Sequence, residues 1–204
     1  MSTTTATRAT ATALRPPTAA LCAGVALLAL GALAIGQSLG AAPDERWQLS
    51  ARYTARLSFL LFLPVYAASS WNRLWPSAAS RFAMRRRRAL GLSFATAHTI
   101  HLGALTTFQI TKGQWPNATT LVVGGGAYLA MFALVATSND AAVRWLGKRW
   151  RRLHQVGVHW LWFVFTFSYA GRVAQGRLAF VPLLAAALGG LALRIAARRR
   201  RAGR

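Results

Sequence analysis

The sequence predicts an all-α fold: an integral membrane six-helix bundle with the N and C termini in the cytoplasm. Three observations support this. The 204-residue chain is 54% hydrophobic and only 14% charged, against roughly 25% charged residues in an average soluble domain. Its apolar residues form runs of about 20 residues, the length that a helix needs to cross a bilayer. Its charged residues are mostly basic, with 25 Lys and Arg against 3 Asp and Glu.

Six apolar runs are expected to be the membrane helices, in the order 18–41, 53–71, 89–111, 118–138, 153–171 and 178–197. The first follows a Ser/Thr/Ala-rich segment, 1–17, which is expected to be a disordered cytoplasmic tail. The first run is either a retained helix or a signal peptide with a cleavage-like site in "SLGAAP". We expect a retained helix, because the run is longer than the roughly 7–15 apolar residues of a signal peptide. Residues 18–197 then form one domain, followed by a basic cytoplasmic tail, 198–204.

The positive charges orient these helices. Cytoplasmic loops of membrane proteins are enriched in Lys and Arg, and the loops between the runs alternate between many and few of them. The side that includes both termini carries 19 of these residues and the other side carries 6, so both termini are expected to be cytoplasmic. The clusters are expected to contact anionic lipids of the bilayer and not nucleic acid, because they lie between apolar runs. The six on the other side are Arg46, Arg52, Arg56, Lys112, Arg172 and Arg177.

Two further features exclude other kinds of cofactor site. The single cysteine, Cys22, excludes an intrachain disulfide, a cysteine zinc cluster and covalently attached c-type heme. The Gly-rich stretch at 124–126 lies inside the fourth run and lacks the strand–turn–helix context of a dinucleotide site. We expect it to allow close helix packing.

All four histidines lie in two apolar runs: His98 and His101 in "SFATAHTIHLGAL", and His154 and His159 in "LHQVGVHWLWFVFTF". An ionisable residue at membrane depth is costly and commonly marks function. A proton relay usually adds carboxylates, which these runs lack, and a hydrolytic zinc site needs a third ligand and a general base. A heme needs only one or two neutral imidazoles in an apolar slot. The histidines therefore favour heme binding over a purely structural role.

Helix geometry limits which histidines can share one iron. His98 and His101 lie about 60° apart and share a face, whereas His154 and His159 lie about 140° apart and cannot both face one neighbour. Counted from the preceding arginines, His98 is about 15 Å deep, His101 about 20 Å, His159 about 10 Å and His154 about 3 Å. The pair His98 and His159 matches best in depth, and His101 with His159 needs a tilt. His154 is expected near the cytoplasmic headgroups, where it would contact a heme propionate or the electron donor.

Three stretches resemble the ferric reductase-like transmembrane domain family. "RRRRALGLSFATAHTIHLGAL", 85–105, is similar to its third helix, with a histidine nine residues after L-G-L, here His101. "ATSNDAAVRWLGKRWRRLHQVGVHW", 136–160, is similar to the segment entering its fifth helix, whose L-G-x-x-W-x-x-L-H pattern ends at His154. "TARLSFLLFLPVYAASSWNRL", 54–74, is similar to its second helix. Within the family, the chain most resembles the heme-binding membrane subunits of bacterial periplasmic methionine sulfoxide reductase systems. The resemblance implies six helices that bind b-type heme between the third and the fifth.

The chain departs from this family on the fifth helix. The family's second histidine there comes thirteen residues after the first, and here that position is Phe167. His159 is the candidate substitute, so either His98 or His101 is expected to pair with it around one heme b. Arg56, at the start of the second run, either faces the heme propionates or extends to the membrane interface.

These observations predict a multi-pass heme b electron carrier of a bacterial inner membrane, an oxidoreductase component without a flavin or NAD(P)H domain of its own. A cytoplasmic flavin reductase or a quinol is expected to supply electrons, so flavin or quinone enters only through a partner. A periplasmic redox protein, a ferric chelate or oxygen is expected to accept them. The alternative is a heme-free membrane transporter or assembly subunit whose histidines are structural.

Overall fold

Regular structure in the computed structural model, which describes residues 18–203, is helical, and no strand occurs among these residues. This confirms the all-α prediction, while the predicted tail 1–17 lies outside the described residues. In chain order the elements are α1 (Thr18–Leu39), α2 (Pro43–Leu74), α3 (Ala78–Arg85), α4 (Arg87–Lys112), α5 (Ala118–Thr120), the π-helical turn η1 (Leu121–Gly125), α6 (Gly126–Ala136), α7 (Asp140–Leu146), α8 (Lys148–Ala174), the 3-10 turn η2 (Leu178–Phe180) and α9 (Val181–Ala202).

Each predicted apolar run falls on a long helical segment, but within residues 18–203 only three segments are long and apolar enough to cross a membrane by length and composition. These are Thr18–Leu39, Ala118–Ala136 and Leu178–Ala202. The other long helices, α2, α4 and α8, are less apolar, and α2 and α4 carry polar side chains into the interior. Thr54 of α2 and His98 of α4 are both buried.

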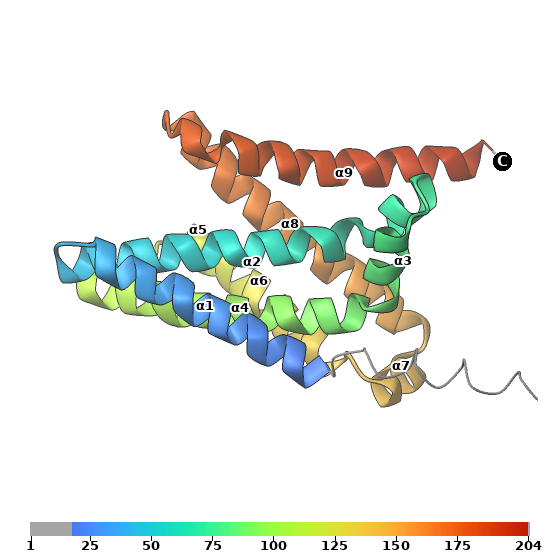
Figure 1. Cartoon of the computed structure of the whole chain (residues 1–204), viewed down its shortest axis with the longest axis horizontal. Helices are drawn as coiled ribbons and strands as arrows, with labels where there is room; N and C mark the ends of the chain where they lie inside the picture. Colours follow the sequence, from blue (N-terminus) through green and yellow to red (C-terminus); the bar gives the residue numbers. More distant parts are fainter. Residues whose placement is uncertain (1–17, 204) are drawn as a thin grey trace, which may run out of the picture.

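Helix α2 lies at the centre of the packing and contacts α1, α4 and α9. In Figure 1, α1, α2 and α4 run side by side, and α8 runs obliquely from α7 to the start of α9. Close approach of α1 and α2 depends on glycine, because a Cβ atom on Gly36 would overlap the backbone of Ser50. The Ser50 hydroxyl also donates a hydrogen bond of 2.8 Å to the Leu33 carbonyl, which ties the two helices together.

Short polar signals set the helix ends. The side chains of Asn117 and Asn139 accept hydrogen bonds from the first turns of α5 and α7, as is usual for N-cap residues. Helix α4 ends at Gly113 with φ 66°, a left-handed conformation that glycine adopts without steric cost. Helix α9 continues to Ala202, so the predicted basic tail is helical as far as that residue. Arginine is a good helix former, and cations are favourable at a helix C-terminus.

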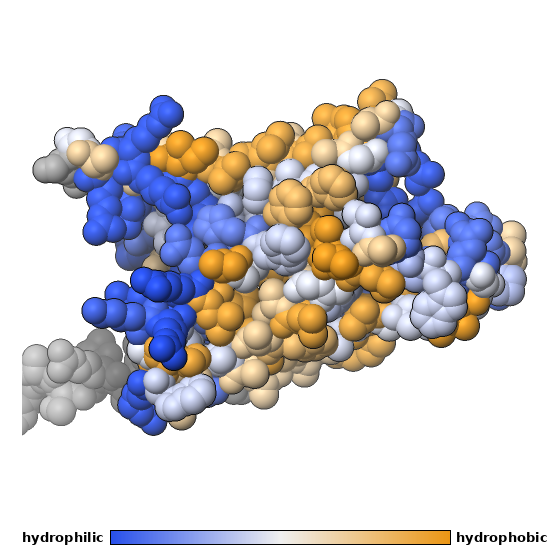
Figure 2. Space-filling model, turned by 180° about the vertical axis from the view of Figure 1, so that it is seen from behind, coloured by the Kyte–Doolittle hydropathy of each residue, from blue (hydrophilic) through white to orange (hydrophobic). Residues whose placement is uncertain are grey.

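The polar surface gathers at the two ends of the molecule. Figure 1 places α3, α7 and the C-terminus together at one end, here called the α7 end. The α1–α2 and α8–α9 connections lie toward the opposite end. Figure 2 shows hydrophilic residues at both ends and a largely apolar band between them.

Candidate functional site

Two cavities lie among α2, α4, α6 and α8, and the two are referred to together as the slot between α4 and α8. The larger, of about 560 Å³, opens at the α7 end and is called the α7-end cavity. The smaller, of about 320 Å³, contains His98 and His101 and is called the two-histidine cavity. Leu161 of α8 lines both. An aromatic cluster lies where they meet: Phe62 and Phe94 line the first cavity, Phe165 lines the second, and the rings of Phe62 and Phe165 are 5.5 Å apart.

His98 is held among aromatic rings in the two-histidine cavity. Its side chain is 7% exposed, and its ring lies 4.9 Å from that of Tyr128 and 5.3 Å from those of Phe94 and Phe165. Its Nδ1 atom is buried and has no hydrogen-bond partner within residues 18–203. Buried polar atoms are nearly always hydrogen-bonded, so an unpartnered nitrogen on a residue that lines a cavity makes this cavity a candidate ligand site.

His101 lies one helical turn further along α4, with its ring 5.1 Å from that of His98. Its Nδ1 atom is 3.1 Å from the hydroxyl of Thr54 on α2. Thr54 is fully buried and also bonds the Ser50 carbonyl at 2.7 Å. The prediction that His98 and His101 share a face of one helix is confirmed by their common cavity.

The outer rim of this cavity is strongly cationic. Its described lining residues include four arginines and no Asp or Glu: Arg52, Arg56, Arg172 and Arg177. The guanidinium groups of Arg56 and Arg172 each lie 5.1 Å from the centre of the Phe180 ring. The Nε atom of Arg56 and the hydroxyl of Tyr169 are buried without a hydrogen-bond partner among the described residues.

Like charges at this rim act on one another. Arg52 and Arg172 lie just outside the predicted spans 53–71 and 153–171. Burial, and then the charges of Arg177 and Arg56, lower the pKa of Arg52. Burial, and then the charges of Arg52 and Arg177, lower the pKa of Arg172. An anionic ligand would relieve this repulsion, because opposite charges within a few ångströms favour the charged form.

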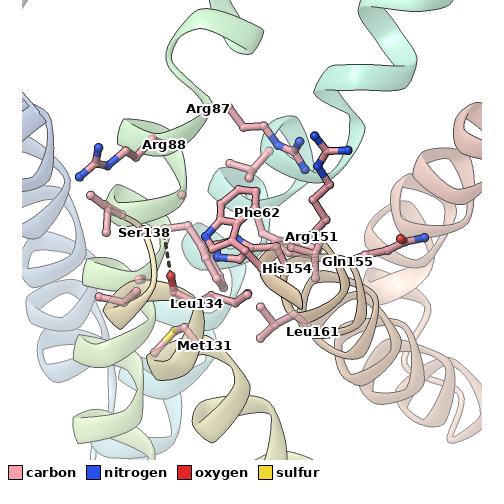
Figure 3. Close-up of a pocket in the computed structure, with 18 of the residues that line it drawn as sticks. Phe62, Arg87, Arg88, Met131, Leu134, Ser138, Arg151, His154, Gln155 and Leu161 are labelled. Atoms are coloured by element: carbon pink, nitrogen blue, oxygen red, sulfur yellow. Dashed lines mark hydrogen bonds between the residues drawn. The ribbon is translucent and has the colours of Figure 1, made fainter. Parts of the chain in front are cut away.

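The α7-end cavity is lined by His154, whereas His98 and His101 line the two-histidine cavity. Figure 3 shows Arg87 and Arg151 at its top and Met131 and Leu161 at its base. The His154 ring stacks on Trp150 with centroids 4.0 Å apart, and its Nε2 atom is 3.1 Å from the Thr137 hydroxyl. His154 therefore lies toward the α7 end of the molecule, fixed by two neighbours.

His159 lies outside both cavities. Its Nδ1 donates a hydrogen bond of 2.7 Å to the Gln155 carbonyl, and its ring contacts the edge of Tyr66 with centroids 5.7 Å apart. The structure thus brings His98 and His101 together with Arg56 but does not bring His159 to them. No three His, Cys, Asp or Glu side chains within residues 18–203 are grouped to hold a metal ion.

Sequence reasoning missed two lining residues of the two-histidine cavity, Tyr169 and Arg172 beside Arg56, and it missed Thr54, which contacts the lining residue His101. The sequence could have pointed to Arg172, because Arg172 is one of only six Lys and Arg residues on the predicted non-cytoplasmic side. Nothing in the sequence marked Thr54, because the hydroxyl of a threonine in an apolar helix usually bonds only a carbonyl of the preceding turn. The Gly-rich stretch serves two purposes. Gly124 lines the cavity, and a Cβ on Gly126 would touch the Trp160 indole at 3.4 Å.

Comparison with known proteins identifies three relatives, each named protein-methionine-sulfoxide reductase heme-binding subunit MsrQ. The relative from Cronobacter sakazakii is 28% identical over 127 residues, covering 55% of this chain and 62% of its own. That from Azospira oryzae is 31% identical over 150 residues, covering 62% and 58%. That from Salmonella arizonae is 33% identical over 100 residues, covering 42% and 50%.

The matched part of the chain spans between half and about three fifths of the length of these relatives. No family model and no solved structure matches the chain. The three names agree with one another. The resemblance predicted from the sequence is therefore confirmed: the chain is similar to the heme-binding subunits of methionine sulfoxide reductase.

Proposed function

We propose that this chain is a heme-binding membrane subunit that carries electrons. The observation that carries the proposal is the position of its unpartnered buried polar atoms. Among residues 18–203 there are four such side-chain atoms, on Arg56, Tyr66, His98 and Tyr169, and all but that of Tyr66 belong to residues lining the two-histidine cavity. A cavity that concentrates these atoms is suited to a ligand that satisfies them.

The chemistry of these atoms fits a heme. An imidazole nitrogen is a ligand for heme iron, and guanidinium groups pair with carboxylates such as propionates. Phe165 and Tyr128 provide flat apolar walls of the kind that a planar macrocycle needs. When bound, heme would supply one-electron redox chemistry; the residues of the chain hold it, exclude water and balance its charge.

We propose His98 and His101 as candidate iron ligands and Arg56 as a partner of the propionates. Because both histidines project from one face of α4, they cannot flank a single heme from opposite sides. The α8 wall of the cavity carries Leu161, Phe165 and Tyr169 but no histidine. Pairing with His159 remains a prediction and requires α8 to turn another face into the slot. The Nε2 atom of His159 is free for that role, because its Nδ1 donates to a carbonyl.

We also propose that the six long helical segments cross a bacterial inner membrane with both termini in the cytoplasm. The 19-to-6 division of Lys and Arg supports this orientation, and the apolar band between two polar ends in Figure 2 supports a position in a membrane. In this orientation the α7 end faces the cytoplasm. The two-histidine cavity then lies nearer the periplasmic side and the α7-end cavity nearer the cytoplasm.

Electrons would then enter at the α7 end and leave at the opposite end. A cytoplasmic flavin reductase or a quinol is the proposed donor, and its flavin or quinone would approach His154. The relatives' name points to a methionine sulfoxide reductase as the periplasmic acceptor, with a ferric chelate as another. The aromatic cluster between the cavities, including Phe62 and Phe165, provides close packing along this route.

Heme content of the purified protein tests the proposal. Protein made with ample heme supply should contain one b-type heme per chain, with a reduced spectrum that changes in His98→Ala or His101→Ala. His159→Ala should remove the low-spin spectrum if His159 supplies the sixth ligand, and should leave it unchanged if His159 stays outside the slot. Wild-type protein without heme would reject the proposal and favour a transporter or assembly subunit.

A further inference from the structure

The hydrogen bonds of Thr54 determine which nitrogen of His101 carries the proton. The Thr54 hydroxyl has one proton, and two acceptors lie near it: the Ser50 carbonyl at 2.7 Å and the Ala51 carbonyl at 3.2 Å. A carbonyl oxygen can only accept a hydrogen bond, so the Thr54 hydroxyl donates its single proton to these backbone carbonyls. The remaining contact, 3.1 Å to His101 Nδ1, then needs a proton from the imidazole.

The consequence concerns the other ring nitrogen. A neutral imidazole carries one proton, so a proton on Nδ1 leaves the Nε2 lone pair of His101 free inside the two-histidine cavity. Metal-binding histidines generally donate their second N–H to a neighbouring group, which fixes the tautomer and the ring orientation. His98, by contrast, has no partner for its Nδ1 among the described residues.

The same proton count gives the opposite result at His154. The Thr137 hydroxyl bonds the Ala133 carbonyl at 2.7 Å and lies 3.1 Å from His154 Nε2. By the same reasoning, Nε2 of His154 would carry the proton and donate it to the Thr137 hydroxyl. Two threonines, each bonded to its own helix, thus set two histidines in opposite tautomers.

We infer that Thr54 is a positioning residue: it holds His101 as the Nδ1–H tautomer and so makes His101, rather than His98, the iron ligand from α4. The assignment of iron rests on the proposed function, but the tautomer does not. Thr54 does not itself line the cavity, so it acts through His101, which does.

Nuclear magnetic resonance of the heme-free protein, with ¹⁵N-labelled histidine, tests the tautomer directly. His101 should show a protonated Nδ1 and His154 a protonated Nε2. Thr54→Val removes the hydroxyl at constant shape and should abolish the preference of His101 alone, whereas Thr54→Ser should retain it. Thr96→Val is the matched control, because the Thr96 hydroxyl bonds only the Leu92 carbonyl of its own helix. A protonated Nε2 on wild-type His101, or a spectrum that Thr54→Val leaves unchanged, would overturn the inference.

Heme titration tests the consequence for the ligand. Thr54→Val should weaken heme affinity about 10- to 100-fold, as other losses of a ligand's hydrogen-bond partner do, and should shift the Soret band. Thr54→Ser should restore both values, and Thr96→Val should match wild type. Equal affinity in wild type and Thr54→Val would reject the role in ligation. If wild type binds no heme, the proposed function fails, while the tautomer measurement still decides what Thr54 does.

Discussion

Replacing His98 by phenylalanine should make the heme-free protein more stable. His98 is 7% exposed, and its Nδ1 atom has no hydrogen-bond partner within residues 18–203. An unsatisfied buried polar atom costs about 1–3 kcal/mol. Phenylalanine removes that cost and keeps the ring contacts with Tyr128, Phe94 and Phe165, which lie 4.9–5.3 Å away. Its extra volume can extend into the adjoining cavity of about 320 Å³, so little overpacking is expected.

We therefore expect His98→Phe to raise the free energy of unfolding of the heme-free protein by about 1–3 kcal/mol. Denaturant-induced unfolding in detergent micelles, followed by tryptophan fluorescence, measures this change. His101→Phe is the matched control: it loses the contact with Thr54 and should lower stability by about 0.5–1.5 kcal/mol. A His98→Phe protein less stable than wild type would refute the view that His98 is kept at a cost to the fold.

Three further predictions concern the rim, the packing and the topology. Arg56→Ala should weaken heme retention and lower the midpoint potential, because a cation near the iron favours the reduced state; redox titration measures both. Gly36→Ala should destabilise the α1–α2 packing by about 1–3 kcal/mol, since its Cβ would overlap the Ser50 backbone. Gly31→Ala, with nothing within 4 Å, should be neutral or slightly stabilising in the same unfolding assay. Reporter fusions after Arg204 and within residues 72–88 should both read cytoplasmic, and a periplasmic signal from either would reject the orientation.

Much of the fold follows from the sequence, because the length of an apolar run determines a long helix almost by itself. The predicted run 89–111 corresponds to α4, Arg87–Lys112, and the run 153–171 lies inside α8, Lys148–Ala174. The short helices α3 and α7 were not predicted. Both have polar N-caps, Ser77 and Asn139, but eight and seven residues are too few for periodicity to show.

The candidate site was only partly predictable, for a reason that lies in α8. Helix orientation is usually read from a polar face opposite an apolar one, but α8 carries large aromatic residues all around, among them Trp160, Trp162, Phe163 and Phe165. The sequence therefore could not tell that Val158 and Leu161 face the slot while His159 does not. On α4, the three-residue spacing of His98 and His101 was enough to place them in one cavity.

The most direct measurement is the heme content and reduced absorption spectrum of the purified protein beside its His101→Ala and His98→Ala variants. Wild type should contain one b-type heme per chain. His101→Ala should lose the heme or its axial ligation, and His98→Ala should keep an iron-ligated heme, because only His101 has its Nδ1 beside the Thr54 hydroxyl. A His101→Ala protein with the full heme content and the unchanged spectrum of wild type would contradict the assignment of the two-histidine cavity as the heme site.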